Sequence, residues 1–107
     1  MIDPGRLNRR LVVEAPAETP DDAGGVVRDY SDIATIWAEL APIAARADAE
    51  AAGAGATVTH RIIMRAGPAI TTRHRLRLDT RLFRIVSVRA HGRAGRFLEI
   101  HAEERVD

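Results

Sequence analysis

The sequence predicts a mainly β protein, a small single-domain β-barrel of about six strands that spans residues 1–107. Short apolar segments with alternating polar residues recur at intervals of about ten residues, which is typical of sandwiches and small barrels. Turn signals that contain Gly or Pro separate these segments. Between two central segments lies a long Ala/Gly-rich stretch, residues 44–56, which we expect to form a projecting loop or a short helix.

Composition excludes several classes of protein. A net charge of +1 gives no overall attraction to nucleic acid or anionic membrane. No apolar run approaches the roughly 20 residues of a membrane span, and the first residues lack the apolar core of a signal peptide. The absence of cysteine excludes disulfides and thiolate chemistry. We therefore expect a protein assembled in the cytoplasm, with no membrane partner. All sixteen cationic residues are Arg, which reflects either a need for bidentate contacts or a GC-rich genome; the Ala content favours the genome.

The first third of the chain predicts a hairpin. An entry turn at 3–6 leads into a first strand, Leu7 to Glu14. Residues 16–25 are polar and predict a loop or wide hairpin turn, in which Gly24 and Gly25 supply the positive φ of a tight reversal. Residues 26–30 then form a short return strand.

Residues 31–42 allow two interpretations. Ile33, Ile36, Trp37 and Leu40 fall at helical spacing, and Ser31 or Asp32 is a suitable N-cap. The same segment also alternates, with Ile36, Ala38 and Leu40 on one side. The pattern alone leans slightly towards a helix.

The second half predicts four strands. The clearest is 57–66, with His60 on its apolar face and Arg61 and Arg65 on the opposite, outward face. Residues 67–68 stop it. Strands at 75–78 and 81–88 follow around a turn at 79–80, and a turn at 91–95 leads to the last strand, 96–102. We expect the tail, 103–107, to be frayed.

The Ala44–Ala56 stretch carries its only charges at Arg46, Asp48 and Glu50. Its composition favours a short helix, which Gly53 and Gly55 would end, but a helix that short is marginal in water. Its side chains are too small to offset the backbone entropy of ordering, so we expect order only through contacts with neighbours. Long connections of this kind are either functional or simple solvent loops.

The residues of catalysis are missing. Neither Ser31 nor Ser87 lies in a nucleophile elbow, and the four histidines lack the spacing of zinc motifs. His101 and Glu103 share a strand face, but zinc normally needs three or four protein ligands, so a solvated edge is the preferred interpretation. We expect His60 to be a buried, hydrogen-bonded structural residue. The sequence thus predicts no enzyme, catalytic residue, metal or cofactor.

An alternative is a small nucleic-acid-binding, OB-like β-barrel. A basic groove could be built from Arg73, Arg75, Arg77, Arg81 and Arg84. Such modules also need exposed aromatic residues on which bases stack. Tyr30, Trp37, Phe83 and Phe97 instead lie in apolar segments and indicate core or interface positions.

Six short motifs occur in a fixed order along nearly the whole chain. They are DPGRL at 3–7, DDAGGVV at 21–27, IATIWA at 33–38, VTHRI at 58–62, GPAIT at 67–71 and LFRIVSV at 82–88. Each is weak alone, and their order and spacing make the match specific. Together they resemble the head–tail joining, or head-closure (stopper or adaptor), proteins of tailed bacteriophages and gene transfer agents.

This resemblance implies a β-barrel in the neck of a virion or gene transfer agent particle, assembled in the bacterial cytoplasm. There it would form a twelve-fold or six-fold ring between the portal/adaptor ring and the tail proteins, with packaged double-stranded DNA nearby. The loop at 44–56 would point into the DNA channel, with Arg46, Asp48, Glu50, Gly53 and Gly55 as its channel residues. Many relatives carry larger side chains there, which argues against a tight side-chain plug here. We expect Trp37, Arg61 and Arg65 at the contacts between subunits.

Overall fold

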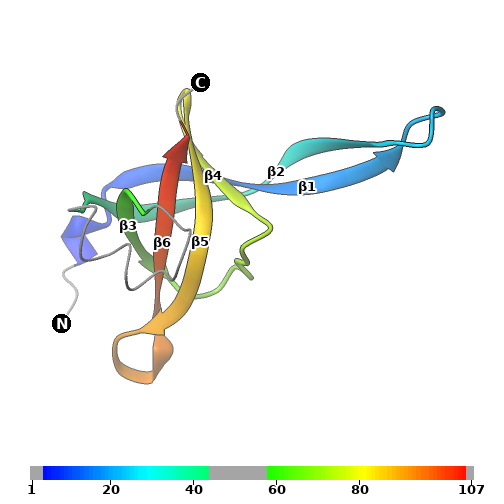
Figure 1. The fold of residues 1–107 in the computed structure, drawn as a ribbon. Helices are drawn as coiled ribbons and strands as arrows, with labels where there is room; N and C mark the ends of the chain where they lie inside the picture. The colour runs from blue at the N-terminus through cyan, green and yellow to red at the C-terminus, as the bar shows by residue number, and fades with distance from the viewer. Residues whose placement is uncertain (1–3, 44–57, 106–107) are drawn as a thin grey trace.

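Six antiparallel strands close into one barrel in the computed structural model, which describes residues 4–43 and 58–105 (Figure 1). Around the barrel the strands follow the order β1-β2-β3-β6-β5-β4, and β4 pairs back with β1. This confirms the predicted fold class. The strands are β1 (Arg9–Pro20), β2 (Val26–Pro42), β3 (His60–Arg65), β4 (Arg75–Leu78), β5 (Arg81–His91) and β6 (Phe97–Arg105), with 3-10 turns η1 (Pro4–Arg6) and η2 (Arg93–Gly95).

The barrel interior is filled by aliphatic side chains from every strand. Phe83 is the one fully buried aromatic among the described residues. Alternation along each strand supplies the rest of the interior, since successive side chains point to opposite faces. The largest fully buried side chains are Phe83, Leu11, Ile62, Met64, Leu76, Ile85, Ile100, Val13 and Val58.

Residues 31–42 form a strand, so the slight preference for a helix was wrong. They belong to the 17-residue strand β2, which pairs with β1 along one edge and with β3 along the other. Ile36 and Ala38 are buried while Thr35 and Trp37 are exposed, the period-two pattern of a strand. The apolar spacing of residues 31–42 fits either a helix or a strand, and pairing of β2 with a strand on each edge decides in favour of the strand.

The loop predicted at 16–25 is also much shorter than expected. β1 continues to Pro20, which pairs with Val26, and only residues 21–25 form the turn. Proline fits here because Pro16 and Pro20 lie in a two-stranded hairpin, where one edge faces solvent and needs no donor. The return strand at 26–30 is therefore the first part of β2.

The chain near its C-terminal end is paired rather than frayed as far as Arg105. Glu103, Glu104 and Arg105 pair with Arg84, Phe83 and Leu82 of β5. Charged cross-strand partners stabilise this end, which the expectation of fraying did not take into account. The strands expected at 75–78 and 81–88 are present, and β5 extends further, to His91.

The hairpin of β1 and β2 continues far beyond the barrel as an arm, residues 15–31 (Figure 1). A register shift between Val13 and Glu14 marks the point where it leaves the barrel. The arm gives the molecule an extent of 52 × 29 × 26 Å. Within the described part of the chain, no helix is long and apolar enough to cross a membrane.

Candidate interaction surfaces

The predicted channel residues, Arg46, Asp48, Glu50, Gly53 and Gly55, lie outside the described residues. The strands that flank this stretch are paired: Pro42 lies opposite His60, and the Ile43 amide donates to the Thr59 carbonyl at 3.1 Å. The chain therefore enters and leaves residues 44–57 at one place, the paired ends of β2 and β3.

Trp37, Arg61 and Arg65 all lie on the outer surface of the barrel. Trp37 is 58% exposed, and both arginines are exposed. Ala38 of β2 pairs with Met64 of β3 in an antiparallel register. The next residues along each strand, Trp37 and Arg65, are therefore opposite each other and lie on the same face. Arg61 lies on the same face four residues along β3 and contributes no ion pair to another described residue.

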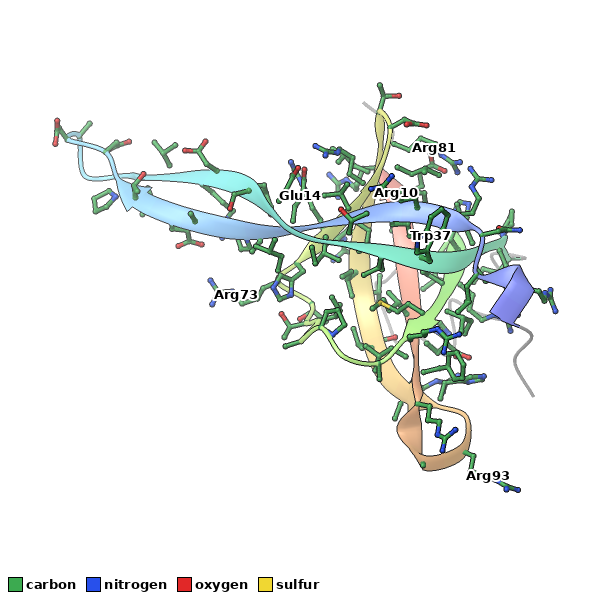
Figure 2. All side chains as sticks on the ribbon, turned by 180° about the vertical axis from the view of Figure 1, so that it is seen from behind. Arg10, Glu14, Trp37, Arg73, Arg81 and Arg93 are labelled. Atoms are coloured by element: carbon green, nitrogen blue, oxygen red, sulfur yellow. The ribbon has the colours of Figure 1, made fainter. Side chains whose placement is uncertain are left out.

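A row of cationic and aromatic side chains crosses five strands at this level. Arg10 pairs with Trp37, Arg65 pairs with Phe97, and Phe97 pairs with His91. The Arg65 guanidinium lies 5.8 Å from the centre of the Phe97 ring. We call these five residues the Trp37 row; Figure 2 shows Arg10 and Trp37 together on the outer face. The strand register, which a single sequence does not reveal, adds Arg10, Phe97 and His91 to the predicted residues.

The arm ends in a narrow acidic tip. The Asp21 carboxylate accepts from the amides of Ala23 at 2.9 Å and Gly25 at 2.7 Å, and Gly24 adopts a φ of +86° that favours glycine. Asp21 therefore shapes the turn, while the Asp22 side chain is exposed and makes no ion pair with a described residue. Behind the tip, Val26 is 63% exposed.

A buried carboxylate fastens the base of the arm to the barrel. Glu14 is 3% exposed; it accepts from Arg75 Nε, and from Arg77 Nη1 at 3.0 Å. Arg77 also reaches Asp32 at 3.2 Å, and the Arg75 guanidinium stacks 3.7 Å from the centre of the Tyr30 ring. Figure 2 shows Glu14 where the arm meets the barrel. This network is not among the features predicted from the sequence, although a Glu that ends an apolar run is a visible signal.

A pocket of about 590 Å³ opens beside this network, between the arm and the connection that leads into β4. We call it the root pocket. Its lining includes Tyr30 and five arginines: Arg28, Arg73, Arg75, Arg84 and Arg105. Four of the five arginines form ion pairs. Arg28 pairs with Glu18 and Arg75 with Glu14, while Arg84 and Arg105 share Glu103. Arg73 is exposed and has no ion pair with a described residue.

The same ion pairs weaken the case for a nucleic-acid groove. Of the five arginines proposed for it, Arg75, Arg77, Arg81 and Arg84 are held by Glu or Asp side chains. Phe83 is buried in the core and offers no stacking face. A groove whose cations are already neutralised attracts phosphate weakly.

The histidines of β3 and β6 belong to buried polar contacts. His60 is 7% exposed, lies 2.9 Å from Thr59 Oγ1, and meets the Phe83 ring edge-on with the ring centres 5.2 Å apart. This confirms the structural role predicted for it. Burial lowers the pKa of His60, and Arg81 adds to that effect, whereas Glu104 opposes it. Hydrogen bonding from Arg81 in turn lowers the pKa of Glu104.

The interpretation of His101 as part of a solvated edge was wrong. His101 is 6% exposed, and its Nε2 lies 2.9 Å from Oε2 of Glu99, which also accepts from Arg89. Burial raises the pKa of Glu99, but the hydrogen bonds from Arg89 and His101 outweigh it and hold the pKa below its usual value. Within residues 4–43 and 58–105, no three or more His, Asp or Glu side chains form a group suited to a metal ion.

Solved structures with this fold include two similar chains. A chain in a structure of the virion of a native gene transfer agent particle is 32% identical, with a TM-score of 0.70, over 94% of this chain and 96% of that one. Protein SF1141 from Shigella flexneri 2a is 27% identical, with a TM-score of 0.73, over 96% of both chains. No curated protein matches the chain in sequence.

The family comparison agrees with the fold and with the order of the sequence motifs. The model of the phage head completion protein family matches residues 2–105, nearly the whole chain. The chain therefore belongs to the phage head completion protein family.

Proposed function

We propose that the chain is a non-enzymatic structural connector in the neck of a tailed phage or gene transfer agent particle. Copies form a six-fold or twelve-fold ring between the portal/adaptor ring and the tail, assembled in the bacterial cytoplasm. Membership of the head completion family and likeness to a chain of a gene transfer agent virion support this assignment.

The Trp37 row is the observation that carries the proposal. An exposed Trp between Arg10 and Arg65 on a closed barrel has the composition of an interface centre, because Trp and Arg are enriched among the residues that dominate binding energy. Arg61 extends the same surface along β3. In a ring each subunit contacts two neighbours, so the binding energy of a single contact can be modest.

The second part of the proposal concerns residues 44–56. Their flanks meet at the paired ends of β2 and β3, and we propose that this end of the barrel faces the ring axis. Arg46 is its single cation against Asp48 and Glu50, and this charge balance opposes DNA without binding it tightly. We propose that the ring closes the channel here behind packaged double-stranded DNA.

Incorporation into particles tests the ring surface. Trp37→Ala, and separately Arg61→Glu with Arg65→Glu, should leave the barrel folded, because these side chains are exposed. Loss of a central contact should lower incorporation about tenfold or more. Ile33→Ala is the matched apolar control, being 51% exposed on the same strand, and Arg93→Glu is the charge control.

Normal incorporation of both test variants would contradict the surface assignment. A separate outcome would favour the nucleic-acid-binding alternative: binding of free single-stranded DNA by the purified chain at physiological salt. We expect no such binding, because the groove arginines are already paired.

A further inference from the structure

We propose that the acidic tip of the arm of one copy docks in the root pocket of the next copy around the ring. The inference rests on the proposed ring and adds the contact that links its subunits. It makes the ring surface heterologous, so that each copy gives its arm on one side and offers its pocket on the other. Contacts of this kind close into rings when the rotation between copies is suitable.

Shape supports the contact. A single copy cannot place its own tip in its own pocket, because the pocket opens at the base of the arm. The strand from Glu14 to Pro20 carries the tip about 20 Å away at roughly 3.3 Å per residue. The turn at 21–25 consists of Asp, Asp, Ala, Gly and Gly, so the tip is slender enough for a pocket of about 590 Å³.

Charge supports the same pairing. Residues 15–31 carry four carboxylates, at Glu18, Asp21, Asp22 and Asp29, and one cation, Arg28, which makes the arm net negative by three. In the root pocket, Glu18, Glu14 and Glu103 already pair with Arg28, Arg75, Arg84 and Arg105, so Arg73 is the pocket arginine without a partner among the described residues. Asp22 at the tip and Arg73 in the pocket are both exposed and have no ion pair with a described residue; Asp29, further along the arm, is also exposed and unpaired but lies behind the tip. Complementary charges of this kind fix orientation and register.

The arm also carries apolar surface that this contact would cover. Val26 and Val27 are 63% and 45% exposed, immediately behind the tip. A two-stranded hairpin that stands clear of its barrel is marginally stable unless something packs against it. Figure 2 shows Arg73 reaching from the barrel on the side from which the arm projects, and Arg93 at the far end of the molecule.

Disulfide trapping in assembled particles tests the contact, because the chain has no cysteine of its own. Particles are prepared with Asp22→Cys plus Arg73→Cys, and control particles with Asp22→Cys plus Arg93→Cys. A disulfide forms only when the two Cα atoms lie about 4.4–6.8 Å apart. After mild oxidation we expect a ladder of two, three and more linked copies in the first preparation and single copies in the control.

Incorporated chain without a ladder would overturn the inference and leave the proposed function standing. Linkage of the Asp22→Cys tip to a different particle protein would overturn it too, since the arm would then dock on that partner. Failure of the unmodified chain to enter particles at all would instead contradict the proposed function.

Charge exchange gives a second test that does not depend on the cysteine variants assembling. Asp22→Arg and Arg73→Asp should each lower incorporation about tenfold, since each places like charges opposite one another. The combined variant should recover most of the loss, because the pair is restored in reverse. Both substitutions are at exposed positions, so the unfolding temperature of the free chain should not change. Losses that simply add in the combined variant would refute the contact.

Discussion

Glu14 is the buried carboxylate on which the junction of arm and barrel depends. It lies at the register shift of β1 and binds Arg75 and Arg77 of β4. Arg75 in turn stacks on the ring of Tyr30, and Arg77 forms an ion pair with Asp32, both of β2. One side chain thereby links three strands at the place where the hairpin leaves the core.

Substitution of Glu14 should destabilise the protein far more than substitution of an exposed Glu. Glu14→Gln removes the charge and leaves two half-buried guanidinium groups poorly paired, which costs about 1–3 kcal/mol. The midpoint of thermal unfolding should fall by about 4–8 °C per kcal/mol for a domain of this size. Glu18→Gln is the control, because Glu18 pairs with Arg28 on the exposed arm and such pairs contribute about 0–1 kcal/mol. Equal effects of the two substitutions would contradict the role given to Glu14.

Stability should fall on acidification in two stages. The pKa of His60 is lowered in the folded protein, chiefly by burial, from its usual value of 6.5. As the pH falls below about 6.5, the unfolded chain therefore binds more protons than the folded chain, and stability falls. The pKa values of Glu99 and Glu104 are also lowered, so their contribution is present above the usual 4.5 and is lost as pH falls through the folded values. We expect the unfolding midpoint to be level near pH 7–8, to decline below about pH 6.5, and to decline further below about 4.5.

A His60→Gln variant isolates the first stage. Its unfolding midpoint should depend less on pH between about 5 and 7 than that of the unmodified chain, while the carboxylate stage remains. A midpoint that rises on acidification in the unmodified chain would show that these groups act with the opposite sign.

At the scale of elements, strands with clear alternation of apolar and polar residues could be predicted from the sequence. The full lengths of β1 and β2, which form the arm, could not. The alternation of 57–66 and the turn at 79–80 predicted β3 and the β4–β5 hairpin. Residues 16–20 look like a loop because Pro, Glu and Thr are polar or rigid, yet they pair across the arm with 26–30. Residues 16–20 are exposed or half-buried and present no alternating apolar face to the core, so periodicity cannot indicate this part of the arm.

The interaction surfaces were predictable only in part, for a related reason. Arg61 and Arg65 could be identified along a single strand as outward residues, and Trp37 as a core or interface residue. The rest of the Trp37 row depends on the register between strands, and the root pocket joins residues more than forty positions apart, such as Tyr30 and Arg75. Register and closure of the barrel are properties of the folded chain that one sequence without relatives does not display.

The stretch at 44–56 should act as an element of closure. Replacing it with a few Gly residues should leave the ring able to form, because the proposed subunit contacts are the Trp37 row, the arm and the root pocket, all outside this stretch. Retention of packaged DNA should fall, because the bulk proposed to lie in the channel is gone. The measurement is the fraction of particles that hold DNA, with an equal-length Gly/Ser segment as the control for chain connectivity. Full retention by the shortened variant would leave a docking role and remove the channel role.

The whole molecule is a closed barrel with one long arm, and this asymmetry suits a ring. The Trp37 row and the root pocket lie on the barrel, while the arm carries the complementary charge away from it. A monomer of this shape exposes apolar groups at Trp37 and Val26 that a ring would cover. The free chain should be monomeric and should assemble only on its particle partner, where neighbouring copies are held close together.

A density map of the neck of particles from cells that produce this chain tests the central claim most directly. We predict a ring of six or twelve copies between the portal/adaptor ring and the tail, with the Trp37 row at subunit contacts and residues 44–56 facing the axis. Density for single, separated copies, or a neck that lacks the chain, would contradict the account.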